Sequence, residues 1–371
     1  MSSASPIPFQ DLTRLHASID TELRAAIDAT LARSSFIAGP DLVAFEDEFA
    51  TAVGAPHAIG CNSGTDALSL VMRALGIGPG DEVIVPSMTY VASAETVLHV
   101  GATLVLADVD PETVLLTEAS VEAVRTPRTK AVIPVHLYGR SVDPAAMRAW
   151  RDMGLIVIED CAQAHLASRD GVPVGSIGHA ACYSFFPGKN LGAMGDAGAI
   201  TTPDASVADE VRRLRDHGRS SKYRHEVLGY SSRLDGLQAA VLRVKLRHLP
   251  DWTDARRALA RRYRDQLTGP DAHPAIGFVP FDDGSVHHLL VVRVAERDRV
   301  QQQLTDEGIA TGVHYPIALS DQPVFAHLGA STPHAEKAAA TVLSLPMDPL
   351  MRLEDVDRVC DALRRAVDAT V

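Results

Sequence analysis

The chain has 371 residues, 46% of them hydrophobic, which is enough to bury a large core spread over two or three domains. Its formal net charge of −12 argues against a general affinity for nucleic acid. The apolar stretches are short and interrupted, and the N-terminus has no basic region followed by a hydrophobic one. The sequence therefore predicts neither a membrane span nor a secretion signal.

Apolar runs alternate with helical patterns along the first 250 residues. This alternation predicts an α/β fold, with a mostly parallel seven-stranded sheet and helices on both of its faces. Helices are expected at residues 63–75 and 144–151. The expected strands are residues 58–61, 82–86, 103–108, 131–136, 155–160, 180–185 and 199–201.

The pattern changes near residue 250. Residues 254–267 predict a charged helix, residues 287–294 a strand and residues 298–307 a further helix. We therefore expect residues 1–249 to form an N-terminal arm and a large domain, and residues 250–371 to form a smaller C-terminal α/β domain.

Four cysteines, Cys61, Cys161, Cys182 and Cys360, show no Cys-x-x-Cys spacing. We expect reduced thiols in a cytoplasmic protein, without disulfides and without a metal site. The adjacent histidines at residues 287–288 fall on a predicted strand, where packing is a better explanation than metal binding.

Small polar residues follow the first predicted strand, in the run Cys-Asn-Ser-Gly-Thr-Asp at residues 61–66. An amphipathic helix begins there, and its first backbone N–H groups together with the helix dipole favour a bound anion. The segment predicts a phosphate cradle. The alternative is a plain helix cap, in which Ser63 or Thr65 bonds the free amides.

Asp160 ends the apolar run at residues 155–160, which is typical of a buried parallel strand. The carboxyl end of such a strand is where open α/β sheets place their ligands. Three residues later, Gln163 offers an amide to a ligand oxygen. His165 lies just beyond, and ordinary packing explains it as well as a functional contact does.

Lys189 follows another apolar run and opens a glycine-containing turn. The chain has only five lysines among its 35 basic residues, so positive charge here is usually supplied by arginine. Lysine, unlike arginine, can form a Schiff base when a desolvated site lowers its pKa. A reactive lysine, a carboxylate for a ring nitrogen and a phosphate cradle together predict pyridoxal phosphate (PLP).

With these segments in place, the chain resembles the DegT/DnrJ/EryC1/StrS family of PLP-dependent sugar aminotransferases, which have the fold type I architecture. The resemblance runs nearly end to end. The motifs that carry it are residues 8–12 (PFQDL), 39–46 (GPDLVAFE), 79–86 (PGDEVIVP), 88–93 (MTYVAS), 136–139 (HLYG), 159–165 (EDCAQAH), 184–192 (SFFPGKNLG), 232–235 (SRLD), 314–317 (HYPI) and 344–347 (SLPM).

The resemblance implies roles around the cofactor ring. Lys189 would carry the cofactor covalently, and Asp160 would pair with the ring nitrogen. Gln163 would contact the ring oxygen, and Tyr90 would stack on the ring face, where an aromatic side chain also keeps water out.

The resemblance also implies how the phosphate is held. Ser184 and the amides of Gly64 and Thr65 would bind it, as a hydroxyl and helix-terminal amides suit a dianion. The family has an asparagine that reaches the phosphate from the partner subunit, and Ser231 stands at that position. A serine is shorter, so it would reach the phosphate through water or not at all.

For the substrate, the resemblance implies contacts from His314 and Tyr315. Ser320 stands where a histidine is frequent in the family, so a contact there is expected to have changed. A diphosphate linker also needs positive partners, and residues 212–225 are far more basic than the chain average. Within that segment, Lys222, Tyr223 and Arg224 are substrate candidates, whereas its first arginines are expected at a solvated helix end.

The resemblance implies a cytoplasmic homodimer with composite active sites. It would transfer an amino group, with glutamate as the expected donor, to C3 or C4 of a keto-deoxysugar linked to a nucleotide, expected to be dTDP. Such a reaction belongs to the biosynthesis of amino sugars and antibiotics. One alternative is a free cyclitol ketone as substrate. Another is a non-enzymatic module that binds PLP and only senses or scaffolds.

Overall fold

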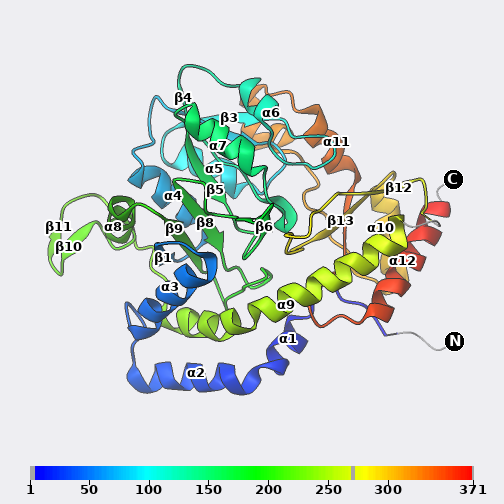
Figure 1. Cartoon of the computed structure of the whole chain (residues 1–371), viewed down its shortest axis with the longest axis horizontal. Helices are drawn as coiled ribbons and strands as arrows, with labels where there is room; N and C mark the ends of the chain where they lie inside the picture. The colour runs from blue at the N-terminus through cyan, green and yellow to red at the C-terminus, as the bar shows by residue number, and fades with distance from the viewer. Residues whose placement is uncertain (1–4, 269–271, 370–371) are drawn as a thin grey trace.

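A computed structural model describes residues 5–268 and 272–369 of the chain. Its centre is a seven-stranded sheet (Figure 1). The strands are β1 (His57–Cys61), β2 (Glu82–Pro86), β3 (Thr103–Ala107), β4 (Thr129–Val132), β5 (Ile156–Asp160), β8 (Ala180–Ser184) and β9 (Gly198–Thr202). They lie in the order β1-β9-β8-β5-β4-β2-β3. Only β9 runs antiparallel to its neighbours, which confirms the predicted mostly parallel sheet.

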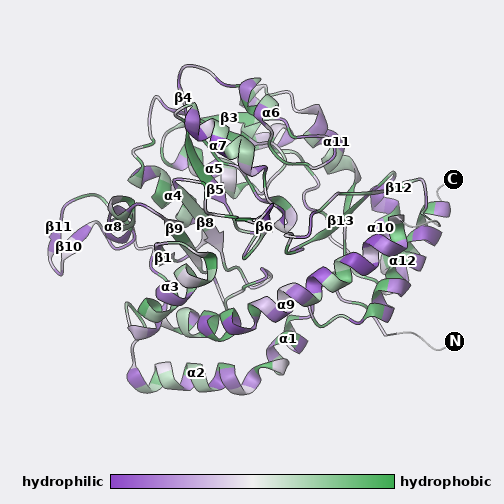
Figure 2. Ribbon diagram, viewed as in Figure 1, coloured by the Kyte–Doolittle hydropathy of each residue, from purple (hydrophilic) through white to green (hydrophobic). Residues whose placement is uncertain are grey.

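Helices cover both faces of this sheet because apolar side chains alternate along its strands. On β2, Val83 and Val85 belong to the core that contains side chains of α4 (Gly64–Ala74), α5 (Ala92–His99) and α8 (Ala205–Leu214). Ile84 between them points to the other face, where α6 (Glu118–Glu122) and α7 (Pro144–Asp152) pack. Further along that face lies α3 (Pro40–Val53). In Figure 2 the hydrophobic colour follows the central strands.

Strand β4 ends four residues earlier than the sequence predicts, at Val132. The chain then passes Pro134, which has no N–H to donate to a neighbouring strand. One isolated bridge, between Val135 and Asp160, continues the pairing before the short 3-10 helix η1 (Leu137–Gly139). This irregular strand end lies beside the predicted catalytic aspartate.

The C-terminal part is built on a second sheet of three antiparallel strands, β12 (Ile276–Phe278), β13 (Leu290–Val294) and β14 (Val342–Leu345). Helices α10 (Arg297–Asp306) and α12 (Leu353–Asp368) share its hydrophobic core. The strand predicted at residues 287–294 begins three residues later, at Leu290. His287 has a left-handed backbone, with φ of 46°, which does not fit an extended strand.

Helix α9 (Gly236–Thr268) joins the two sheets as one 33-residue helix that runs through Pro250 (Figure 1). The helix predicted from residue 254 thus begins much earlier. Proline removes one backbone hydrogen bond, but buried side chains on both sides of it hold α9 together. The expected domain boundary between residues 249 and 250 falls inside this helix, so that division stays a prediction.

The remaining elements surround these two sheets. Helices α1 (Leu12–Ser18) and α2 (Asp20–Arg33) form an N-terminal arm that packs on α9. The hairpin of β10 (Arg219–Ser221) and β11 (Arg224–His225) projects away from the sheet at the left of Figure 1. The other elements are β6 (Ser168–Arg169), β7 (Val172–Pro173), α11 (Pro333–Thr341), η2 (Leu319–Asp321) and η3 (Pro323–Leu328).

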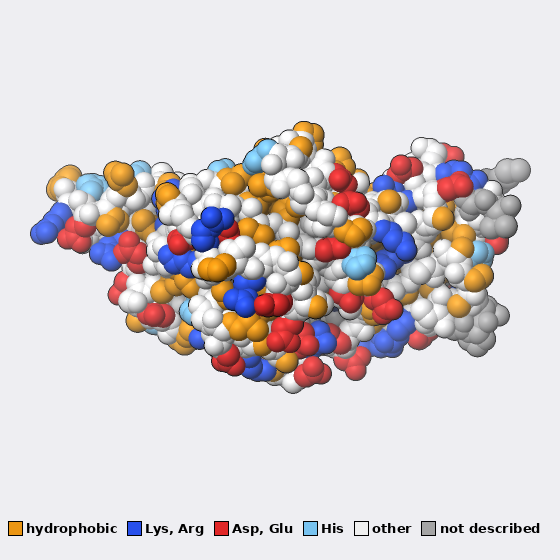
Figure 3. Space-filling view, turned by 90° about the horizontal axis from the view of Figure 1, so that it is seen from above, with side chains coloured by type: hydrophobic (Ala, Val, Ile, Leu, Met, Phe, Trp, Pro, Cys, Tyr) orange, Lys and Arg blue, Asp and Glu red, His pale blue; other side chains and the backbone are white. Residues whose placement is uncertain are grey.

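The surface mixes charges of both signs. On the face drawn in Figure 3, basic and acidic side chains lie among apolar ones, so the net charge of −12 is not gathered into one patch there. Within the described ranges, every helix is too short or too polar to cross a bilayer.

Candidate active site

A cavity of about 570 Å³ opens at the carboxyl ends of β5 and β8. This is the edge at which open α/β sheets bind ligands. It brings together nine of the residues that the sequence singled out: Gly64, Thr65, Tyr90, Asp160, Gln163, Ser184, Lys189, His314 and Tyr315. These residues come from segments far apart in the chain, and only the fold places them around one space.

One end of the cavity is formed by the N-terminus of α4. Ser63 caps this helix, because its hydroxyl oxygen accepts a hydrogen bond of 3.0 Å from the backbone N–H of Asp66. The N–H groups of Gly64 and Thr65 bond to no atom in the described part of the chain. The Ser63 cap therefore leaves these two amides available to an anion, and Ser184 lines the same space.

Asp160 lies at the end of β5 and is 6% exposed. Its Oδ2 accepts a hydrogen bond of 2.8 Å from the Ser93 hydroxyl, and its Oδ1 accepts one of 3.1 Å from the backbone N–H of Ala162. Both bonds hold the carboxylate in a fixed orientation at the wall of the cavity. Each oxygen keeps capacity to accept a further bond from a ligand in the cavity.

Gln163 lies between two tyrosines. Its Oε1 accepts a hydrogen bond of 2.6 Å from the backbone N–H of Tyr138, and its Nε2 donates one of 3.0 Å to the Tyr315 hydroxyl. The second hydrogen of Nε2 stays available for a ligand oxygen. The ring of Tyr90 lies 5.8 Å from that of Tyr315 and is 56% exposed, so one side of it is free to stack.

Lys189 follows β8 in a turn that its own N–H closes by bonding to the Phe186 carbonyl at 2.8 Å. Burial of the amine lowers its pKa from 10.5 to about 8, although the negative charge of Asp160 partly opposes this. A larger share of neutral amine makes Lys189 a better nucleophile at neutral pH.

Three histidines near Lys189 are held neutral. Burial lowers the pKa of His165 to about 3 and of His314 to about 4, and it lowers that of His288 well below 6.5. In each case the positive charge of Lys189 adds to the effect. The site therefore places three neutral imidazole rings near the amine.

Only two of these histidines line the cavity, His288 and His314. His165 lies outside it, fully buried against the rings of Tyr183 and Phe185, which favours its packing role. His288 was missed as a site residue, since we expected residues 287–288 only to pack. Its Nδ1 lies 3.3 Å from Oδ1 of Asn190, the neighbour of Lys189, and no spacing in the sequence indicates that contact.

Several expected site residues do not line this cavity. Lys222, Tyr223 and Arg224 are exposed in the hairpin of β10 and β11. Ser231 is exposed, and its hydroxyl accepts a hydrogen bond of 3.3 Å from Arg233.

Ser320, the other departure from the family pattern, also makes its hydrogen bonds outside the cavity. Its hydroxyl lies 2.6 Å from that of Thr332 and 3.3 Å from that of Ser87. It does not line the cavity, so in place of the usual histidine this position has a serine that is hydrogen-bonded within the chain.

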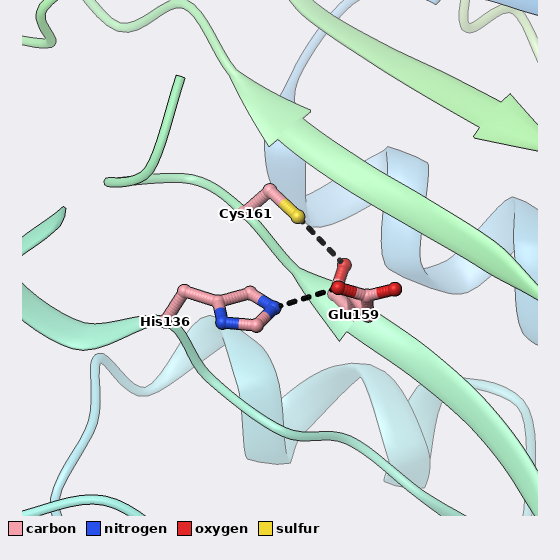
Figure 4. Close-up of side chains that lie close together, drawn as sticks. All are labelled: His136, Glu159 and Cys161. Carbon is pink, nitrogen blue, oxygen red and sulfur yellow. Dashed lines mark hydrogen bonds and ion pairs between the residues drawn. The ribbon is translucent and has the colours of Figure 1, made fainter. Parts of the chain in front are cut away.

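His136, Glu159 and Cys161 form a buried cluster (Figure 4), and the last two flank Asp160 in the chain. Oε2 of Glu159 lies 2.9 Å from Nε2 of His136 and also accepts a bond from the N–H of Gly175. Its Oε1 accepts bonds from two further amides, those of residues 177 and 178. Because these atoms are already hydrogen-bonded, we interpret the cluster as an anchor for the end of β5.

A model of the DegT/DnrJ/EryC1/StrS aminotransferase family matches residues 17–364. The chain belongs to this family. It is 46% identical, over 99% of its length and 100% of the relative's, to a UDP-N-acetyl-3-dehydro-alpha-D-glucosamine 3-aminotransferase of Acidithiobacillus ferrooxidans. It is 44% identical, over 96% and 95%, to a dTDP-3-amino-3,4,6-trideoxy-alpha-D-glucose transaminase of Streptomyces venezuelae.

Solved structures agree with this assignment. The crystal structure of DesV from S. venezuelae superposes with a TM-score of 0.94 at 43% identity, over 98% of this chain and 99% of that one. This confirms the expected fold type I architecture. The chain is therefore a sugar aminotransferase, and the non-enzymatic module considered as an alternative is set aside.

Members of this family use PLP, and the site residues fit that group. A structure of NtdA from Bacillus subtilis, with bound pyridoxamine phosphate, has a TM-score of 0.91 at 32% identity, over 98% of this chain and 86% of that one. In this aminotransferase, free amides at the start of α4 suit the phosphate, and the ionisable pair of Asp160 and Lys189 lies in the same cavity. Lys189 would hold the cofactor, and Asp160 would bond its ring nitrogen.

Proposed function

We propose that this aminotransferase transfers the amino group of glutamate to C3 of a keto-deoxysugar linked to a nucleoside diphosphate, with dTDP as the nucleotide. The observation that carries the proposal is the cavity in which Lys189, Asp160 and the start of α4 meet. The names of both relatives place the amino group at position 3 of a nucleotide-linked sugar. We choose C3 over C4 for that reason.

The protein's own residues have separate roles in this reaction. PLP, when bound, supplies an electron sink for the carbanion left after proton removal. Asp160 would hold the ring nitrogen, and the amides of Gly64 and Thr65 with Ser184 would hold the phosphate. Lys189 Nζ moves the proton, and its pKa of about 8 lets it both take and return one near neutral pH.

We also propose that the enzyme is a homodimer with composite sites. Three large apolar side chains are exposed. Tyr223, in the hairpin of β10 and β11, is 85% exposed, and Leu228, just after it, is 96% exposed. Phe186, in the turn that contains Lys189, is 57% exposed. Apolar groups of this size favour burial against another chain. In such a dimer, Lys222 and Arg224 of the hairpin would reach the partner's substrate diphosphate.

The four cysteines are free and buried, which supports a cytoplasmic location.

The test is the reverse reaction, because amino sugars are more stable than keto sugars. Purified enzyme with PLP is incubated with 2-oxoglutarate and a dTDP-linked or UDP-linked 3-amino sugar, and glutamate release is measured. We expect release with the dTDP-linked 3-amino sugar, and none from the Lys189→Ala variant.

The same assay separates the alternatives. The matched 4-amino isomers test the carbon, and a free amino-cyclitol tests the cyclitol alternative. Turnover of the free cyclitol with none of the nucleotide-linked sugars would overturn the proposed function. Preference for the UDP-linked sugar would change only the nucleotide.

A further inference from the structure

Ser93 connects helix α5 to the aspartate at the end of β5. It is 1% exposed, it lines the cavity, and its Oγ lies 2.8 Å from Oδ2 of Asp160. Strand β4 lies between β2, which leads into α5, and β5. The contact therefore depends on the packing of segments 67 residues apart in sequence.

The direction of the hydrogen bonds follows from chemistry. An ionised carboxylate only accepts, so the single proton of the Ser93 hydroxyl points to Asp160. Oγ of Thr89 lies 3.1 Å from Oγ of Ser93. Since Ser93 has already used its proton, Thr89 must be the donor in this second contact. A directed relay results, from Thr89 to Ser93 to Asp160.

We propose that Ser93 is a positioning residue that fixes the orientation of the Asp160 carboxylate toward the cavity, with Thr89 fixing the Ser93 hydroxyl in turn. Without Ser93, Oδ2 has no donor among the described residues, and Oδ1 keeps only the N–H of Ala162. The carboxylate could then rotate away from a ligand. This inference rests on the role of Asp160 in the proposed function.

The experiment is a double-mutant cycle of Ser93→Ala and Asp160→Asn. Two quantities are measured: the dissociation constant of PLP from apoenzyme, by fluorescence, and the rate of the half-reaction with glutamate. A hydrogen bond to a charged group makes about a tenfold difference or more. We expect Ser93→Ala to weaken PLP binding and to slow the half-reaction by about tenfold each.

The second arm of the cycle identifies how Ser93 acts. Asp160→Asn alone should slow the half-reaction by several orders of magnitude, because a neutral ring nitrogen is a poor electron sink. If Ser93 acts through the charge of Asp160, adding Ser93→Ala to that variant should change either quantity by less than about twofold. An equal tenfold loss in both backgrounds would overturn the inference and leave the proposed function intact.

Two further variants complete the test. Thr96→Val is the control. It removes another buried hydroxyl of α5, which donates a hydrogen bond of 2.9 Å to the backbone carbonyl of Ala92, and it should leave PLP binding unchanged. Thr89→Val should cause a smaller loss than Ser93→Ala. If Asp160→Asn itself leaves both quantities unchanged, the role of Asp160 in the proposed function is wrong, and this inference is wrong with it.

Discussion

Gly64 and Ser184 approach so closely that a Cβ atom on the glycine would lie 2.7 Å from Cβ of the serine. The first turn of α4 and the end of β8 therefore meet at the place where we expect the phosphate. Only a residue without a side chain lets both approach the same anion.

We predict that Gly64→Ala weakens PLP binding. The added methyl group must push Ser184 or the start of α4 aside, which costs about 1–3 kcal/mol in a packed site. If that cost falls on the bound state, it corresponds to about fivefold to about 150-fold in affinity. The dissociation constant measured on apoenzyme tests this. Gly78→Ala is the control, since its Cβ would meet only the Val100 carbonyl oxygen at 3.7 Å. Equal affinities for both variants would contradict the cradle.

The lowered pKa of Lys189 predicts how apoenzyme captures PLP as pH changes. With a pKa of about 8, about one amine in ten is neutral at pH 7, against about one in three thousand for an ordinary lysine. Only the neutral form attacks an aldehyde. The rate of covalent capture, followed by absorbance, should rise with pH and level off above about pH 8. A rise that continues to about pH 10.5 would show that burial does not perturb this amine, and Lys189→Ala gives the background.

The buried carboxylate of Glu159 predicts an effect on stability. Its burial opposes ionisation, but hydrogen bonds from His136 and from backbone amides outweigh this, so its pKa lies below the usual value. The pKa is lowered on folding, so this contribution is present above about pH 4.5 and is lost as pH falls through the pKa of the folded state.

Glu159→Gln should therefore lower the free energy of unfolding at pH 7 by about 2–4 kcal/mol. The NH₂ group of the glutamine would lie where one carboxylate oxygen of Glu159 accepts two hydrogen bonds. It would face other donors, so those bonds would be lost. Urea unfolding measures the change. Glu122→Gln alters an exposed carboxylate on α6 and should leave the unfolding midpoint unchanged. A Glu159→Gln midpoint equal to that of wild type would mean that the anchor does not hold β5.

Ser231 allows a test of the proposed dimer. If residues 230–234 reach the partner's phosphate, Ser231→Asn adds one hydrogen bond to a charged acceptor, about 1.5–3 kcal/mol at most. PLP binding should then tighten by about tenfold or somewhat more, and by less if water already bridges the gap. Ser231→Ala, which adds no amide, is the matched control. Unchanged affinity for the asparagine variant would place this loop away from the phosphate.

The amino-acid sequence by itself determined the parts of this protein that depend on local order. The seven strands of the large sheet fall on short, mostly apolar runs. Asp160 ends one of these strands and Lys189 lies in the turn after another, so their place at one sheet edge could be predicted. The start of α4 could be predicted as well, because small residues after a strand leave amides free.

Tertiary packing decided the contacts between segments that no spacing connects. Ser93 reaches Asp160 across β4, His288 meets Asn190 beside Lys189, and Ser320 bonds Ser87 and Thr332 rather than facing the cavity. Helix α9 continues through Pro250 because buried side chains on both sides outweigh one lost backbone bond. These contacts are stabilised by neighbours that lie far away in the chain. Local sequence patterns do not indicate which residues those neighbours are.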